Sequence, residues 1–88
     1  MQINKDFTIQ KVGAQFVAVP VGETSKTFHG MVRLNETGAF LWRALAERDM
    51  TEAELVDALL AEYDVAREIA ERDVHRVTEV LRENGILV

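Results

Sequence analysis

The chain has 88 residues, of which 48% are hydrophobic and 28% are charged, with a single proline and no cysteine. This composition indicates one globular domain over residues 1–88 and excludes an intrinsically disordered chain, and the lack of cysteine excludes disulfide bonds and thiolate metal sites. With a net charge of −5 and no stretch close to the roughly 20 apolar residues that span a bilayer, we expect a cytoplasmic protein with no membrane segment.

The first part of the chain predicts three strands. Residues 7–12 alternate in polarity, as a strand near a sheet edge does, and residues 15–21 are apolar at nearly every position, which is typical of a central strand. Gly13 permits a type II′ hairpin turn between them, because glycine accepts the positive φ that this turn requires. After a polar loop, residues 27–34 alternate again and form the third predicted strand.

Three helices are predicted next, at residues 36–47, 52–63 and 66–84. Asn35 is expected to cap the first helix, and Thr51 with Glu54 forms a capping box for the second. Gly85 ends the third helix by taking the left-handed conformation, after which residues 86–88 can fold back as an apolar clamp. Three antiparallel strands followed by three helices predict an α+β fold close to a winged helix-turn-helix.

The third helix has more apolar residues than one small core can readily cover. At 100° per residue, Val74 and Val77 fall in the middle of an apolar stripe, whereas Ile69 and Val80 fall on its margin beside charged residues. Either a loop or the C-terminal tail covers this margin, or it stays partly open. An open apolar margin flanked by charges would suit one wall of a binding groove.

The sequence shows no catalytic or metal-binding pattern. His29 and His75 lie on different elements and have no second ligand at helical spacing. The carboxylates follow helix faces at spacings typical of solvated charge pairs, and no glycine-rich phosphate loop is present. We therefore expect a protein that is not an enzyme and that needs no cofactor or metal.

Four short motifs in order resemble the PqqD family of peptide chaperones, also called RiPP recognition elements. The motifs are Leu34-Asn35-Glu36-Thr37-Gly38-Ala39 with Leu41-Trp42, Thr51-x-x-Glu54-Leu55-Val56, Glu62-Tyr63-Asp64-Val65, and Asp73-Val74-x-x-Val77-x-x-x-Leu81-x-x-x-Gly85-Ile86. The resemblance as a whole covers essentially residues 7–88. The resemblance implies a small non-catalytic domain that binds the leader of a ribosomally made precursor peptide and presents it to a modifying enzyme, often a radical SAM protein.

The resemblance also implies where the peptide binds. The leader would add as a strand beside the third strand, with its side chains against the third helix, so that backbone hydrogen bonds give affinity and pockets give specificity. Arg33 and Arg76 would pair with acidic leader residues, and Met31 and Val80 would meet apolar ones. The implied binding residues are His29, Gly30, Met31, Val32, Arg33, Leu34, Ile69, Asp73, Arg76, Val77 and Val80.

Two other functions share the same fold outline. A winged-helix DNA-binding regulator would need basic residues at its recognition helix, but residues 1–46 have a net charge of +2 and residues 47–88 a net charge of −7, which disfavours nucleic acid as a partner. A structural subunit of a larger complex would have a stable partner and no peptide site. An exposed edge strand also makes a homodimer possible.

Overall fold

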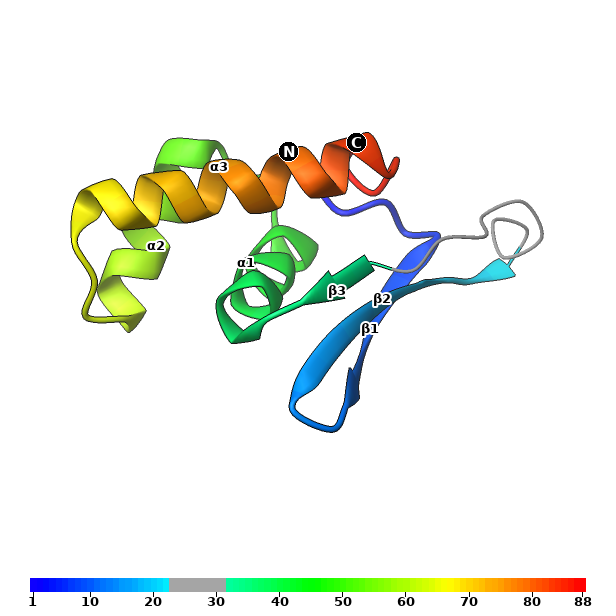
Figure 1. Ribbon diagram of the computed structural model, residues 1–88. Helices are drawn as coiled ribbons and strands as arrows, with labels where there is room; N and C mark the ends of the chain where they lie inside the picture. Colours follow the sequence, from blue (N-terminus) through cyan, green and yellow to red (C-terminus); the bar gives the residue numbers. More distant parts are fainter. Residues whose placement is uncertain (23–31) are drawn as a thin grey trace.

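The computed structural model describes residues 1–22 and 32–88 and contains a three-stranded antiparallel sheet followed by three helices (Figure 1). The expected α+β fold class is therefore confirmed. The sheet has the order β1-β2-β3, which makes β2 the central strand. The elements are β1 (Phe7–Val12), β2 (Gln15–Pro20), β3 (Val32–Leu34), α1 (Glu36–Glu47), α2 (Glu52–Glu62) and α3 (Arg67–Glu83).

A tight hairpin joins β1 to β2. Val12 lies opposite Gln15, and Gly13, the first of the two residues between them, takes a φ of +64°. No other residue type in the described ranges has a positive φ, so Ala14 keeps a negative one, as a type II′ turn requires. The turn can form because Gly13 occupies the position with positive φ, where a residue with a side chain would be strained.

The sheet has one face toward the helices and one face away from them. Phe16 pairs with Leu34 and Ala18 with Val32, and all four side chains are buried on the face toward the helices. Val17 lies on the outer face but is only 7% exposed, which agrees with the apolar character of β2 on both faces.

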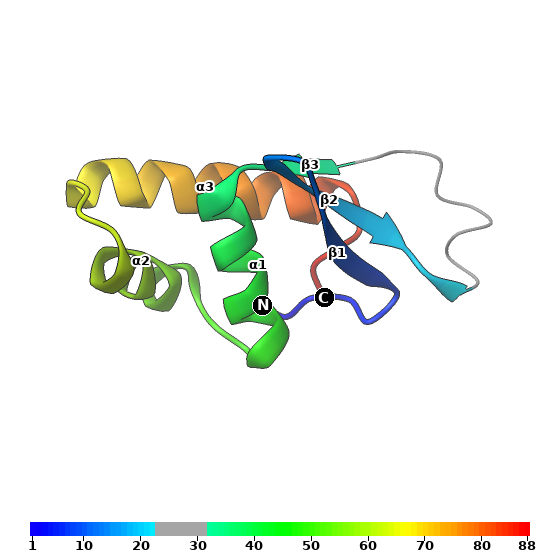
Figure 2. The ribbon, with the colours of Figure 1, turned by 90° about the horizontal axis from the view of Figure 1, so that it is seen from below.

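Helix α1 lies between α2 and the sheet, and α3 runs along one side of all three (Figure 2). Helix α1 contacts β2, β3, α2 and α3, and its Leu41 and Leu45 are almost fully buried. Trp42 of the same helix is also buried, at 3% exposure. A single core therefore holds the helices and sheet together, and α1 fixes the position of β3 relative to α3.

The helix ends follow the sequence signals closely. Thr51 and Glu54 form both hydrogen bonds of the capping box at the start of α2. At the end of α3, Gly85 has a φ of +71°, its N–H donates to the Arg82 carbonyl, and the Ile86 N–H donates to the Leu81 carbonyl. This pair of bonds is a Schellman motif, with Ile86 and Leu81 both buried.

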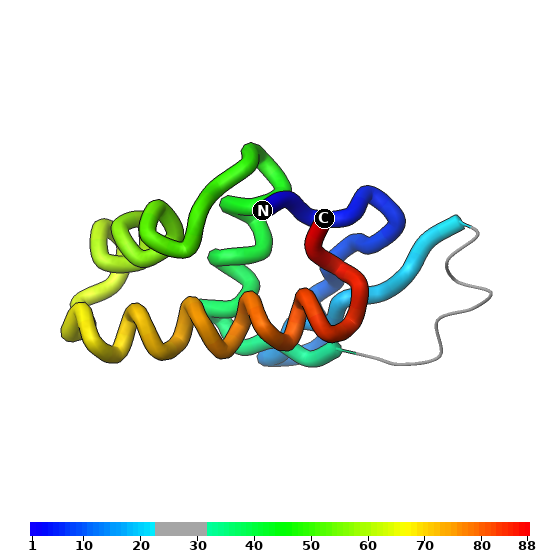
Figure 3. Tube along the Cα trace, turned by 90° about the horizontal axis from the view of Figure 1, so that it is seen from above, coloured from blue at the N-terminus to red at the C-terminus, as the bar shows by residue number. Residues whose placement is uncertain are grey.

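The tail after α3 folds back, as expected, and pairs with the beginning of the chain (Figure 3). Ile3 and Leu87 form an antiparallel bridge, and Gln2 and Val88 exchange backbone hydrogen bonds of 3.1 and 2.9 Å. The tail thus covers the core beside the N-terminal segment and leaves Ile69 42% exposed.

The observed elements differ from the expected ranges at their ends. The β2 strand ends at Pro20, one residue early, and Tyr63, Ala66 and Asn84 are cap residues outside the helices. Of the third expected strand, residues 27–31 lie outside the described residues, and β3 covers the rest. Within the described ranges, no helix is both long and apolar enough to cross a membrane.

Candidate functional site

An open cleft lies between the edge strand β3 and helix α3. Among the described strands, β3 pairs only with β2. The backbone N–H and C=O groups that point away from β2, about half of those in β3, therefore have no strand partner. The cleft has a volume of about 210 Å³. Its lining residues come from the two elements and the start of α1: Arg33, Leu34, Asn35, Arg76, Val77 and Val80.

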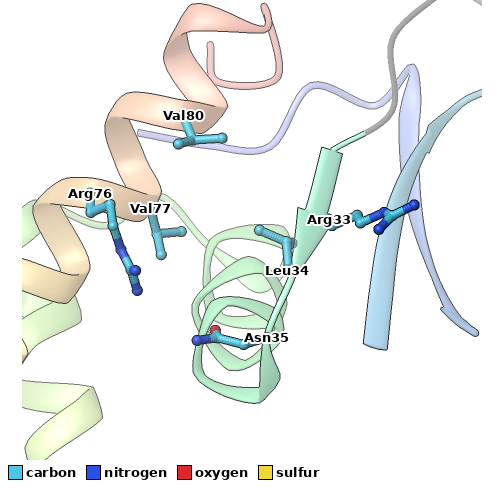
Figure 4. Close-up of a pocket in the computed structure, with 6 residues that line it drawn as sticks. All are labelled: Arg33, Leu34, Asn35, Arg76, Val77 and Val80. Atoms are coloured by element: carbon cyan, nitrogen blue, oxygen red, sulfur yellow. The ribbon is translucent and has the colours of Figure 1, made fainter. Parts of the chain in front are cut away.

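The floor of the cleft is apolar. Leu34 from β3 and Val77 from α3 are 7% and 5% exposed and point toward each other, with the partly buried Val80 one turn further along α3 (Figure 4). Drug-sized ligands occupy pockets of roughly 300–1,000 Å³. The smaller volume and the open strand edge suit one or two side chains of an extended peptide better than a compact small molecule.

Arg33 and Arg76 border the cleft in different ways. The Arg33 side chain extends from the opposite face of β3, away from α3 (Figure 4), and is exposed. Arg76 lies on the α3 wall, where its guanidinium is 3.6 Å from the carboxylate of Asp73 on the same helix. Arg76 therefore already has an acidic partner, whereas the ion pairs found among residues 1–22 and 32–88 do not include Arg33.

Of the eleven residues expected to bind a peptide, the structure gathers five around this cleft: Arg33, Leu34, Arg76, Val77 and Val80. Val32 is buried beneath it in the core, and Asp73 reaches it only through Arg76. Ile69 is exposed but two turns before Val77, beyond the residues that line the cleft. His29, Gly30 and Met31 lie outside the described residues.

Asn35 is a lining residue that the sequence indicated only as a helix cap. Its Oδ1 accepts hydrogen bonds from the Gly38 N–H at 2.8 Å and from the Thr37 hydroxyl at 3.0 Å, as capping predicts. A Cβ at Gly38 would come within 3.2 Å of this Oδ1 and 3.3 Å of Leu34. Glycine there lets Leu34 and Asn35 pack against the first turn of α1, which fixes one side of the cleft.

A second, wider cleft of about 690 Å³ lies between the hairpin, α1 and the end of α2. Phe40 and Tyr63 meet there edge to face, with ring centres 5.6 Å apart, and the Arg43 guanidinium lies 5.2 Å from the centre of the Phe16 ring. Burial raises the pKa of Tyr63, and the nearby carboxylates of Glu36 and Glu62 raise it further by smaller amounts. This cleft does not border the free edge of β3, and nothing in the sequence pattern indicated it.

The described ranges contain no group of three or more His, Asp or Glu side chains that could hold a metal ion. His75 is exposed, and its Nδ1 lies 3.5 Å from the Glu52 carboxylate on α2. The Thr78 hydroxyl is fully buried within hydrogen-bond distance of the same carboxylate and of the His75 carbonyl. This polar group connects α2 to α3 and lies apart from the cleft.

Comparison with known proteins connects this geometry to a family. The family model described as coenzyme PQQ synthesis protein D (PqqD) matches residues 16–87. No curated protein matches the chain.

Two solved structures share the fold. The chain is 26% identical to TbiB1, whose structure is described as a complex with the TbiA(beta) leader peptide, with a TM-score of 0.73 over 99% of this chain and 94% of that one. It is 24% identical to a lasso peptide synthetase B1 complexed with its leader peptide, with a TM-score of 0.71 over 99% and 95% of the two chains.

Proposed function

The chain belongs to the PqqD family, and from that premise we propose that it is a non-catalytic chaperone that binds the leader segment of a ribosomally made precursor peptide. The leader adds to β3 as a further strand and is presented to a modifying enzyme, with a radical SAM protein as the expected type. The domain then works in the cytoplasm, where a ribosomal product is made.

The observation that supports this proposal most is the open edge of β3 facing an apolar helix wall. A strand added there would form backbone hydrogen bonds with β3 and place every second side chain over Leu34, Val77 and Val80. The same arrangement is consistent with the two structural relatives, both of which are described as complexes with leader peptides. The proposed binding residues are those that line the cleft, together with His29, Gly30 and Met31, which precede β3 in the sequence.

A DNA-binding role is not favoured. The exposed start of α3 carries Glu68 and Glu71 beside Arg67 and Arg72, so it has no net positive charge with which to bind a phosphate backbone. A homodimer through β3 remains part of the proposal as a competing use of the same edge.

The test is a titration of the ¹⁵N-labelled domain with the leader segments of precursor peptides encoded beside its gene. We expect saturable binding with shifts at residues 32–35 and 76–80. A complex whose shifts fall only elsewhere, for example in the second cleft around Phe40 and Tyr63, would refute the proposed site.

A further inference from the structure

The two sides of β3 differ in chemistry, and this difference bears on which peptides can bind. Side chains alternate across a strand, so Leu34 faces α3 while its neighbour Arg33 faces the outer side of the sheet (Figure 4). A strand added at the free edge of β3 continues the same pleat. Its residue beside Leu34 therefore enters the cleft, and its residue beside Arg33 lies on the outer face.

The inner side selects an apolar residue. A side chain there would contact Leu34, Val77 and Val80, two of which are nearly buried in the unliganded domain. The charge on the helix wall, Arg76, already has Asp73 as its partner at 3.6 Å. A carboxylate placed in this cleft would lose its water and would compete with Asp73 for the Arg76 guanidinium.

On the outer side, Arg33 has no acidic partner among residues 1–22 and 32–88. Arg33 lies directly opposite Val17 of β2, which in turn lies opposite Gln10 of β1. The described residues that line a depression of about 350 Å³ on this face include no carboxylate: Gln10, Val12, Gln15, Val17, Val19 and Arg33. Within the part of the chain that the structure describes, Arg33 is thus an unpaired positive charge at the sheet edge of a protein whose net charge is −5.

We propose that this domain recognises side chains on both faces of the bound peptide strand. Its ligand is a strand with an apolar residue in the cleft and an acidic residue at the adjacent position, beside Arg33. This inference rests on the proposed function and adds the substrate class to it. Arg33 is the specificity residue for the acidic position, and Leu34, Val77 and Val80 are those for the apolar position.

The inference can be tested with synthetic threonine-rich peptides that carry one leucine and one glutamate. Adjacent placement puts the two side chains on opposite faces of a strand, whereas placement two residues apart puts them on the same face. We expect the adjacent peptide to bind about two- to fivefold more tightly, the range for an exposed cross-strand charge pair. Replacing the leucine with serine should weaken binding about tenfold or more.

Protein variants test whether Arg33 is the residue that selects the acidic position. With Arg33→Gln the preference for adjacent placement should vanish, and with Arg33→Glu it should transfer to a peptide carrying lysine in place of glutamate. Arg72→Gln, which removes an exposed arginine of α3 that does not line the cleft, is the matched control and should keep the preference.

The results distinguish a failure of this inference from a failure of the proposed function. Binding at β3 and α3 with equal affinity for both placements, or a preference that survives Arg33→Gln, would overturn this inference and leave the proposed function standing. If shifts at millimolar peptide concentrations avoid β3 and α3, or are absent for every peptide, the proposed site itself is wrong.

Discussion

Replacing Val80 with aspartate should abolish most peptide binding while leaving the domain folded. Val80 is partly buried on the rim of the cleft, so in the free domain the new carboxylate can remain in water. The loss of apolar burial should cost about 1 kcal/mol of folding free energy, which lowers the melting temperature by about 4–8 °C in a domain of this size.

Binding should suffer more than folding, because a peptide strand over the cleft would cover the carboxylate. A polar group covered without a partner costs about 1–3 kcal/mol, and the lost contact with the peptide adds to that cost. We expect a total of about 2–3 kcal/mol, which corresponds to a dissociation constant raised roughly 30- to 150-fold.

The assay is fluorescence anisotropy with a labelled leader peptide, together with thermal melting of each variant. Val65→Asp is the matched control, since Val65 is 37% exposed and precedes α3, whose first residue, Arg67, already lies about 15 Å along the helix axis from Val77. It should bind within about twofold of the wild type. If a folded Val80→Asp variant binds within about threefold of wild type, or if both variants lose affinity equally, the reasoning about the cleft is wrong.

Three further outcomes are expected. Asn35→Ala should destabilise the domain by about 1 kcal/mol in chemical denaturation, because the Gly38 N–H loses its acceptor. Asn35→Ser keeps a capping oxygen and should cost only a few tenths of a kcal/mol. Equal stability of the two variants would contradict the capping role. Burial, Glu36 and Glu62 raise the pKa of Tyr63 above its ordinary 10.0, so the folded state retains a proton that the unfolded state releases. Folding stability should therefore fall as the pH rises above about 10, and it should fall less in Tyr63→Phe. The ultraviolet titration of this single tyrosine should have its midpoint above 10.0. A midpoint at or below 10.0 would refute the raised pKa of Tyr63. If a dimer forms through β3, saturating leader peptide should shift sedimentation toward the monomer, and a peptide-bound dimer would show that the two do not share that edge.

Much of the fold could be predicted because its signals are local. Capping at Asn35 and Thr51, the glycine at 13 and the glycine at 85 each set a backbone conformation that needs no tertiary information, and all four behave as expected. The residues at element ends were less certain, since a cap residue differs from a helical one only in its backbone angles.

The candidate site could be predicted only in part. The angular position around α3 correctly placed Val80 and Ile69 outside the core centre, but it carries no information on where along the helix β3 lies. Val80 therefore lines the cleft, whereas Ile69 is exposed beyond it. The pairing of His75 with Glu52 and the cleft around Tyr63 depend on how α2 packs against its neighbours, which no periodicity specifies.

The most direct test of the central claim is amide hydrogen exchange of the domain with and without saturating leader peptide. The described sheet has two outer strands, so β1 serves as an internal control for β3. Addition of a strand to β3 predicts that the amides of residues 32–34 that point away from β2 gain protection, whereas those on the free edge of β1 do not change. Saturated binding without added protection at β3, or with new protection at the edge of β1, would contradict the proposal.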